Sequence, residues 1–204
     1  MNTKIALVTG GSRGLGKNTA LVLAQKGVDV IITYHSKKAE ADEVVAEIEK
    51  HRQKAVALQL NVAESQSFDG FAAQIKTALK QKWNSEHFDF LVNNAGTGVH
   101  TSFMETTEEQ FDQMVNIHLK GVFFLTQKLL PHMADGGRIV NVSSGLTRFS
   151  IPGYTAYATM KGGVETLTKY LAKELGARKI TVNVVAPARL KQILVVVLCA
   201  ITRK

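Results

Sequence analysis

Between residues 9 and 16 the chain reads Thr9-Gly10-Gly11-Ser12-Arg13-Gly14-Leu15-Gly16, its most informative stretch. An apolar run at residues 5–8 precedes it and an amphipathic run at residues 14–26 continues from it, which predicts a strand, a loop and a helix. Glycines allow a sharp turn, a close approach of backbone to a ligand, and tight packing of the helix on the sheet. Because a helix start also offers free N–H groups to phosphate, the stretch predicts a dinucleotide-binding loop. It is no Walker loop, since Gly16-Lys17-Asn18 lacks the hydroxyl that holds magnesium.

The alternation of strand and helix patterns continues along the chain. Further strands are expected at residues 28–33, 55–60, 88–92, 137–142 and 180–185, and further helices at residues 37–52, 64–80, 107–132 and 154–176. This alternation predicts an α/β fold with a parallel sheet and helices on both faces. Right-handed crossovers make it a doubly wound, Rossmann-type sheet, which binds ligands at the carboxyl ends of its strands.

Length and composition narrow the class of protein. The 204 residues fit a single domain, 1–204, in which residues 189–204 form an atypical tail. The formal net charge is +8, but the lysines are spread along helical stretches, so we expect no nucleic-acid partner. The apolar runs are too short to span a bilayer, so we expect no membrane partner, and a single cysteine favours a cytoplasmic location. No metal site is expected; His118 and His132 lack a companion ligand at helical spacing and are interpreted as structural.

The segment after the second expected strand indicates which dinucleotide the loop prefers. It reads Tyr34-His35-Ser36-Lys37-Lys38 and holds no carboxylate that would bind the ribose hydroxyls or repel a 2′-phosphate. Arg13 and the two lysines can pair with such a phosphate, assisted by the hydroxyls of Ser36 or Tyr34. We therefore expect NADP(H) rather than NAD(H).

Tyr157 and Lys161 form the candidate reaction centre. They are four residues apart in an expected helix, so they share a face. A free tyrosine titrates near pH 10, and a neighbouring ammonium lowers that pKa, which would make Tyr157 a general acid or base. Ser144 closes the fifth expected strand at its carboxyl end, and Asn116 lies in the helix before that strand. A Tyr-x-x-x-Lys spacing alone is weak evidence.

As a set, the motifs are stronger evidence than the Tyr-x-x-x-Lys spacing alone. Thr9-Gly10-x-x-x-Gly14-x-Gly16, Asn93-Asn94-Ala95-Gly96, Asn116, Ser143-Ser144 and Tyr157-x-x-x-Lys161 occur in this order. The chain thereby resembles the short-chain dehydrogenase/reductase family over residues 4–187, most of all NADPH-dependent reductases of the 3-oxoacyl-(acyl carrier protein) reductase type. The resemblance implies an enzyme that transfers a hydride between NADP(H) and a carbonyl or secondary alcohol. Tyr157 would be the acid or base, Lys161 would bind the nicotinamide ribose, Ser144 the carbonyl oxygen, and Asn116 a water.

The loop and the resemblance together predict the residues that bind the cofactor. The Asn61-Val62 pair resembles the family's Asp-Val pair beside the adenine, and Asn94 has the alternative of a turn that only stabilises the strand end. The resemblance also implies a homo-oligomer, at least a dimer, through the helices that carry Asn116 and Tyr157. The expected cofactor-binding residues are Gly10, Ser12, Arg13, Gly14, Leu15, Gly16, Tyr34, His35, Ser36, Asn61, Val62, Asn93, Ala95, Gly96, Tyr157, Lys161 and Pro187.

The resemblance ends after Pro187. Ala188 stands where the family has glycine, and residues 189–204 differ from the family's substrate-covering segment. The apolar run at residues 193–201 could form an edge strand or a helix over the cleft. A second interpretation is therefore a truncated or non-catalytic NADP(H)-binding remnant that lacks this segment. The substrate is not readable, although Phe149, Ile151 and Tyr154 suggest an apolar pocket wall.

Overall fold

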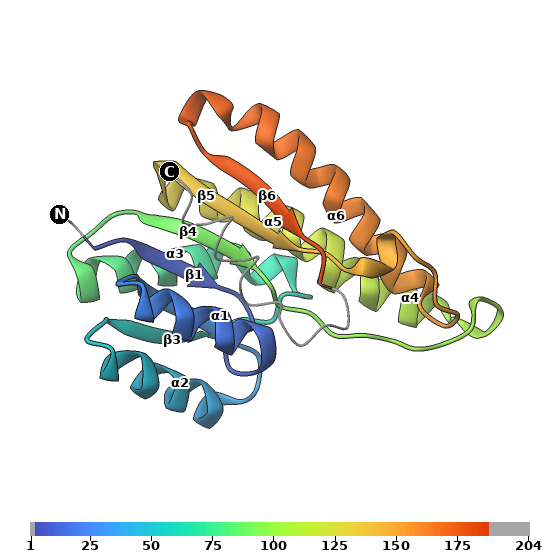
Figure 1. The fold of residues 1–204 in the computed structure, drawn as a ribbon, viewed down its shortest axis with the longest axis horizontal. Coiled ribbons are helices and arrows are strands. Elements are labelled where there is room, and N and C mark those ends of the chain that lie inside the picture. The colour runs from blue at the N-terminus through green and yellow to red at the C-terminus, as the bar shows by residue number, and fades with distance from the viewer. Residues whose placement is uncertain (1–2, 188–204) are drawn as a thin grey trace.

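Within residues 3–187, which the computed structural model describes, six parallel strands form one sheet in the order β3-β2-β1-β4-β5-β6 (Figure 1). The order reverses between β1 and β4, so the carboxyl ends of these two strands form the switch point at which such sheets bind ligands. The strands are β1 Ile5–Val8, β2 Asp29–Tyr34, β3 Ala55–Gln59, β4 Phe88–Asn93, β5 Met133–Val142 and β6 Thr181–Val185.

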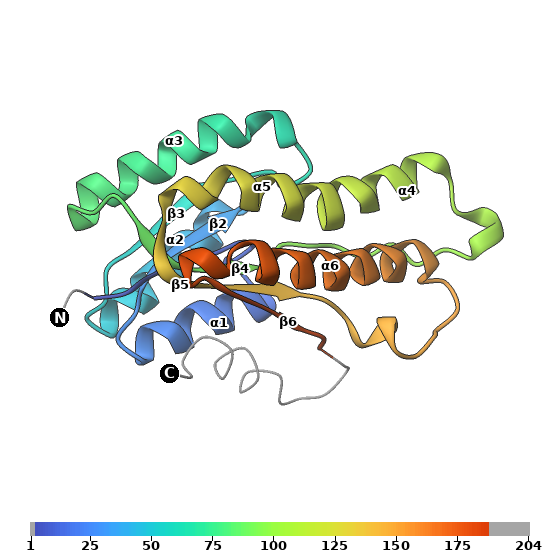
Figure 2. The ribbon, with the colours of Figure 1, turned by 90° about the horizontal axis from the view of Figure 1, so that it is seen from above.

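Helices cover both faces of the sheet and form two apolar cores. Buried residues of α1 and α2 pack on one face, with Leu23 and Ile48 among them. Residues of α3 and α5, including Phe68 and Leu129, pack on the other face together with the inner side of α6. Figure 2 shows α3, α5 and α6 on the side of the sheet opposite α1. The α-helices are α1 Gly14–Gln25, α2 Lys38–Lys50, α3 Phe68–Ala78, α4 Glu108–Met114, α5 Gly121–Leu129 and α6 Thr155–Glu174. The expected doubly wound α/β fold is confirmed.

The helix expected at residues 107–132 is interrupted, which changes the residues that face the site. It starts with a capping box between Thr107 and Gln110. After α4 a π-helical turn, Val115–Lys120, precedes α5. Where this turn joins α5, Gly121 packs closely against the backbone of Val62. Only glycine fits there, because a Cβ on residue 121 would lie 2.4 Å from the carbonyl oxygen of Val62. A π turn adds one residue per turn, so it rotates the side chains that follow away from the faces that a continuous helix would give them.

Two further boundaries differ from the prediction. The fifth strand starts at Met133 instead of residue 137, because Gly136, with φ of +74°, lets the strand pass a register shift against β4. The Asp135-Gly136-Gly137 sequence suggests a turn and conceals this strand. The expected helix at 64–80 starts with a 3₁₀ turn and ends with a π turn, Leu79–Trp83. Our expectations for Ala188 and the tail lie outside the described residues.

Among the described residues, no helix combines the length and apolar character that crossing a bilayer requires.

Candidate active site

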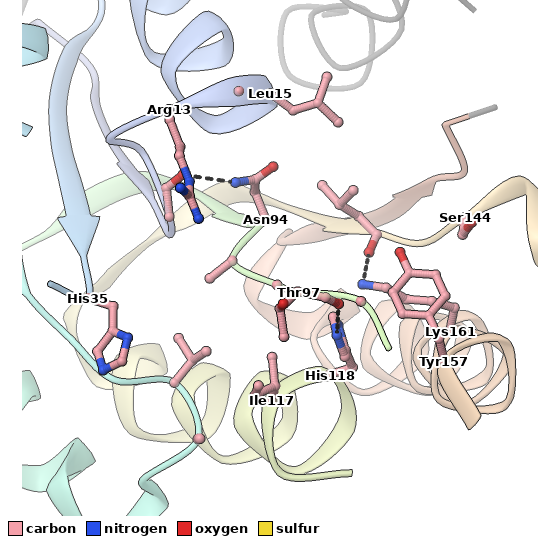
Figure 3. Close-up of a pocket in the computed structure, with 18 of the residues that line it drawn as sticks. Arg13, Leu15, His35, Asn94, Thr97, Ile117, His118, Ser144, Tyr157 and Lys161 are labelled. Atoms are coloured by element: carbon pink, nitrogen blue, oxygen red, sulfur yellow. Dashed lines mark hydrogen bonds between the residues drawn. The ribbon is translucent and has the colours of Figure 1, made fainter. Parts of the chain in front are cut away.

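A cleft of about 1200 Å³ runs along the carboxyl ends of the strands, from the glycine loop to Tyr157 and Lys161 (Figure 3). Arg13, Lys37 and Lys161 bring positive charge to its wall, and none of its described lining residues is an aspartate or glutamate. Such a wall favours a ligand with several negative charges.

The glycine loop is shaped by two close backbone contacts. Gly10 has a φ of +65°, a conformation that L side chains rarely adopt. A Cβ on Gly16 would lie 2.1 Å from the carbonyl oxygen of Gly10, so only glycine lets α1 start this close to the loop. Ser12, Arg13 and Leu15 line the cleft beside this turn. Because Gly10 and Gly14 also line the cleft, the loop presents backbone to a phosphate ligand alongside these residues.

Asn94 holds the glycine loop against β4. Its side-chain amide donates hydrogen bonds to the carbonyl oxygens of Thr9 (2.8 Å) and Gly10 (3.2 Å). In return, the Thr9 hydroxyl accepts from the backbone N–H of Asn94 (2.9 Å) and of Ala95 (3.0 Å). The structure thus gives Asn94 a structural role at the strand end, and Asn94, Ala95 and Gly96 all line the cleft.

Asn93 lies elsewhere than the sequence predicts. Its side chain is buried and donates to the Thr126 hydroxyl (3.0 Å) and to Oδ1 of Asn141 (2.8 Å). Asn141 in turn donates to the Thr168 hydroxyl (2.9 Å), which completes a polar network between β4, β5, α5 and α6. The expected contact of Asn93 with the cofactor is therefore corrected. Successive side chains of a strand point to opposite faces of the sheet, and that of Asn93 points to the face covered by α5 and α6.

The far end of the cleft is formed by residues after β2 and β3. Tyr34 is largely buried, whereas His35 and Ser36 are exposed, and all three line the cleft together with Asn61 and Val62. The Asn61 side chain organises the local turn: its amide donates to Glu64 (2.7 Å), and its Oδ1 accepts from the N–H of Ala63 (3.1 Å).

The two lysines that follow Ser36 differ in their surroundings. Lys37 lines the cleft, with its Nζ 3.9 Å from a Glu40 oxygen. Lys38 instead pairs with Asp42 at 2.6 Å, along α2 and away from the cleft lining. Arg13 and Lys37 are therefore the cations available to a phosphate at this end.

Ser144, Tyr157 and Lys161 come together at the other end. Ser144 follows β5, is 9% exposed, and caps a 3₁₀ turn by accepting from the N–H of Leu146 (3.2 Å). Lys161 is buried in α6; its Nζ donates to the Val142 carbonyl (2.7 Å) and lies 5.6 Å from the centre of the Tyr157 ring. Pro187 lines the cleft and accepts from the N–H of Gly145 (3.0 Å).

The pKa of Tyr157 differs from the sequence-based expectation. Burial raises it, and a hydrogen bond with Ser144 only partly opposes this effect. Burial also lowers the pKa of Lys161 to about 8. Desolvation is thus the dominant effect on the Tyr157 pKa, although the Lys161 ammonium lies over the ring. Tyr157 is therefore a neutral phenol near pH 7, which suits a proton donor.

His118, rather than Asn116, reaches this end of the cleft. Both residues lie in the π turn, but Asn116 is half-buried and does not line the cleft, whereas Ile117 and His118 do. The ring of His118 packs edge-on against Tyr157, with centroids 5.0 Å apart. From the sequence, His118 is expected to be a structural residue. Helical spacing could not predict its position at the cleft, because the π turn alters the face on which it lies.

The wall of the cleft beside Ser144 and Tyr157 is largely apolar. Leu146, Phe149, Ile151 and Tyr154 line it, with Phe149 and Ile151 about half exposed. His100 packs edge-on against Tyr154 at 4.9 Å between ring centroids. The apolar wall expected from the sequence thus lies next to Ser144 and Tyr157.

Comparison with known proteins assigns the family. The family model described as short chain dehydrogenase matches residues 4–194. The chain belongs to the short-chain dehydrogenase family. The expected family and its oxidoreductase class are thereby confirmed.

The curated relatives of this short-chain dehydrogenase include two kinds of reductase. A hydroxynaphthalene reductase-like protein, Arp2 of Metarhizium brunneum (strain ARSEF 3297), is 39% identical over 92% of this chain and 68% of its own length. The 3-oxoacyl-[acyl-carrier-protein] reductase FabG of Staphylococcus aureus (strain Mu50 / ATCC 700699) is 42% identical over 91% of this chain and 74% of its own length.

Among solved structures, the landomycin C-6 ketoreductase LanV with bound NADP and rabelomycin is similar to this short-chain dehydrogenase. It is 39% identical, with a TM-score of 0.87, over 90% of this chain and 75% of its own. The promiscuous reductase LugOII, which catalyses keto-reduction at C1 during lugdunomycin biosynthesis, is also 39% identical, with a TM-score of 0.88, over 92% of this chain and 78% of its own.

Proposed function

We propose that this short-chain dehydrogenase reduces a ketone to a secondary alcohol with NADPH, and that Tyr157 donates the proton. The observation that carries the proposal is the arrangement of one cleft: a glycine loop at one end and Ser144, Tyr157 and Lys161 at the other. In sheets of this type a dinucleotide binds along the carboxyl ends of the strands, which is the line that joins these two ends of the cleft.

The cleft suits NADP(H) chemically. Arg13 and Lys37 would pair with its 2′-phosphate, and the backbone from Gly10 to Gly16 would hold its pyrophosphate, where a Cβ on Gly16 would collide with the loop. Lys161 would bind the nicotinamide ribose. The chemistry that the bound nicotinamide supplies is hydride donation or acceptance. The relatives LanV and a short-chain dehydrogenase from Burkholderia cenocepacia J2315 have been crystallised with NADP.

The protein's own residues supply the proton and the orientation. Tyr157, neutral because burial raises its pKa, gives its phenol proton to the carbonyl oxygen as that oxygen gains negative charge. The Ser144 hydroxyl donates a hydrogen bond to the same oxygen. Lys161, still mostly an ammonium below its pKa of about 8, stabilises the tyrosinate that remains.

The apolar wall indicates the kind of ketone. Leu146, Phe149, Ile151 and Tyr154 offer apolar and aromatic surface beside the reacting groups. We infer a substrate with a flat or extended apolar body next to its carbonyl, in keeping with relatives named as a C-6 ketoreductase with bound rabelomycin and as a 3-oxoacyl-[acyl-carrier-protein] reductase.

The test is NADPH oxidation with aromatic ketones and 3-oxoacyl thioesters. Tyr157→Phe removes the proton donor, so we expect a fall in kcat of about 1000-fold while NADPH still raises the Tm. Equal turnover by the wild type and by Tyr157→Phe would contradict the role of Tyr157. Tight NADPH binding without turnover of any ketone would favour the alternative, a non-catalytic NADP(H)-binding protein.

We further propose a homodimer and a cytoplasmic location. Phe111, Phe123, Phe124 and Tyr170 are exposed on α4, α5 and α6, the helices expected to form the dimer. Exposed aromatic side chains that lie together favour a protein partner. One cysteine in the sequence excludes an intrachain disulfide, as suits a reducing compartment.

A further inference from the structure

Glu165 connects α6 to the turn that follows β5, although the reaction proposed above does not involve it. It lies within α6, half-buried and outside the lining of the cleft. Its Oε1 accepts a hydrogen bond from the Ser143 hydroxyl at 2.8 Å and another from the Thr147 hydroxyl at 2.7 Å. These two residues stand on either side of Ser144 in the sequence. One carboxylate therefore holds the Ser144 turn (residues 143–147) at two points.

One face of α6 carries three groups that contact this turn or the strand end before it. Tyr157, Lys161 and Glu165 are spaced four residues apart, so their side chains follow one another along the helix. Tyr157 forms a hydrogen bond with Ser144. The Nζ of Lys161 donates to the carbonyl of Val142 at 2.7 Å, and Figure 3 shows Tyr157 and Lys161 side by side on α6. Glu165 thus extends by one helical turn the row on which the reacting groups lie.

Each of the two hydroxyls has a second acceptor within reach, and the distances favour the carboxylate. A hydroxyl carries one hydrogen, so it donates to one acceptor at a time. The Ser143 oxygen lies 3.4 Å from the Lys161 carbonyl, farther than its 2.8 Å from Glu165. The Thr147 oxygen lies 2.9 Å from the Ser144 carbonyl and 2.7 Å from Glu165. Because hydrogen bonds to a carboxylate are stronger than those to a neutral carbonyl, both hydroxyls donate to α6.

Loss of the Glu165 carboxylate would release the Ser144 turn from this contact with α6. The Thr147 hydroxyl would then donate within its own turn, to the Ser144 carbonyl, and would no longer join the turn to the helix. The Ser144 side chain accepts from the N–H of Leu146, so it moves with the turn. A displacement of about 1 Å between reacting groups can lower a rate about 100-fold.

We propose that Glu165 is a positioning residue of the catalytic centre, whose carboxylate holds the Ser144 turn on the helix that carries Tyr157 and Lys161. It fixes the distance between the Ser144 and Tyr157 hydroxyls, which must both reach the same carbonyl oxygen of the substrate. The inference rests on the proposed function, because this distance matters only where Ser144 and Tyr157 act on one ketone.

Two substitutions of Glu165 separate its hydrogen bonds from its place in the helix. Glu165→Gln keeps an oxygen that accepts from both hydroxyls and loses the charge. Glu165→Leu has a similar helix propensity but no acceptor. Glu174→Leu is the matched control, because it makes the same change at an exposed position at the end of α6. The Tm of each variant is measured together with kcat, the KM for the ketone and the KM for NADPH.

A positioning role predicts one order of activities. We expect Glu165→Leu to lose about 100-fold in kcat with little change in the KM for NADPH, because the glycine loop lies at the other end of the cleft. Glu165→Gln should retain most of its kcat, and Glu174→Leu should be as active as wild type. Wild-type kcat in Glu165→Leu would overturn the proposal, and so would equal losses in Glu165→Leu and Glu165→Gln.

The same two hydrogen bonds can be removed from the other side. Ser143→Ala combined with Thr147→Val takes away both donors and leaves Glu165 in place. We expect this double variant to lose kcat as Glu165→Leu does. Adding Glu165→Leu to it should cost little more, because substitutions that remove the same contact are not additive. Losses that multiply in the triple variant would show that Glu165 acts through other contacts, and the proposal would be wrong.

A spectroscopic readout does not depend on turnover. The ¹³Cζ NMR signal of Tyr157 at pH 7, assigned with Tyr157→Phe, reports its hydrogen bond with Ser144, and Ser144→Ala shows the signal without that bond. The signal should move towards that of Ser144→Ala in Glu165→Leu and stay unchanged in Glu165→Gln. Identical signals in wild type and Glu165→Leu would overturn the proposal. A wild type that reduces no ketone would refute the proposed function, while this signal would still decide whether Glu165 positions Ser144.

Discussion

At the scale of single residues, the cofactor loop depends on one glycine more than on its neighbours. Gly16 lies where any Cβ would meet the Gly10 carbonyl at 2.1 Å, and that obstacle is backbone, which cannot move aside cheaply. Gly14 has a φ of +56° but open space around it, so its requirement is conformational only. The glycines of the loop are thus required for different physical reasons.

Gly16→Ala should abolish tight NADPH binding and lower stability, because either the loop or the start of α1 must shift. Gly162→Ala is the matched control: Gly162 lies within α6 with no atom within 4 Å of its would-be Cβ, so alanine should stabilise the helix by up to about 1 kcal/mol. Fluorescence titration with NADPH and thermal unfolding measure both effects. Normal NADPH affinity in Gly16→Ala would contradict the packing argument.

Titration of His118 should make the protein less stable in mild acid. Its pKa is lowered from 6.5 to about 4 in the folded protein, so the unfolded chain takes up the proton first as the pH falls. The contribution of the neutral His118 ring to the free energy of unfolding is complete above pH 6.5. It is lost between pH 6.5 and 4, and the loss amounts to at most about 3 kcal/mol. Lys161 does not contribute in this window, because its folded and unfolded pKa values both lie above it.

Urea unfolding at pH 7 and pH 5 checks this prediction. His118→Gln carries no titratable ring, so its free energy of unfolding should fall less between the two pH values than that of wild type. Carboxylates titrate in both proteins and cancel in the comparison. Equal losses in both proteins would mean that His118 keeps an ordinary pKa.

At the scale of secondary-structure elements, side-chain amides join segments that are distant in sequence. Asn94, at the end of β4, bonds to the backbone after β1, and Asn93 and Asn141 join β4 and β5 to the helices behind them. These bonds hold the carboxyl ends of neighbouring strands in register at the cleft. The site therefore depends on how strands end as much as on the residues that face the ligand.

Asn94→Ala removes two hydrogen bonds to the glycine loop, at Thr9 and Gly10. We expect a loss of about 2 kcal/mol in the free energy of unfolding. We also expect a weaker affinity for NADPH, because the loop is no longer held in its binding shape. Asn18→Ala, at an exposed position of α1 near the same loop, serves as the control and should change neither quantity. A loss of stability with unchanged NADPH affinity would show that the loop keeps its shape without Asn94.

At the scale of the whole molecule, charge and exposed aromatic surface are distributed unevenly. Three cations, Arg13, Lys37 and Lys161, line a cleft whose described lining residues include no carboxylate, so positive charge is concentrated at the ligand site. The exposed aromatic side chains on α5 include Phe123 and Phe124, whose rings are in contact at 5.0 Å. This surface is where a second copy of the chain would bind.

Light scattering coupled to gel filtration should therefore show a dimer. Phe123→Glu combined with Phe124→Glu should convert it to a monomer, because charges would replace apolar contact at the interface. Lys50→Glu, on the exposed side of α2 in the other helix layer, introduces a similar charge change and should leave the dimer intact. A monomeric wild type would contradict the proposed interface.

Much of this protein was predictable from local patterns. The glycine loop, the alternation of strands and helices, and the spacing of Tyr157 and Lys161 each depend on residues close in sequence, where backbone geometry allows few alternatives. These features were enough to predict the fold class, the family and the position of Tyr157 at the cleft.

Other properties exist only once distant segments meet. Asn93 and Asn94 are adjacent, yet one joins a buried network and the other holds the loop, because Asn93 is the last residue of β4 whereas Asn94 follows the end of the strand. A π turn brings His118, rather than Asn116, to the cleft. The direction of the Tyr157 pKa shift depends on burial, which no spacing of residues encodes. Orientation and desolvation are set by neighbours that folding assembles, so they required the three-dimensional structure.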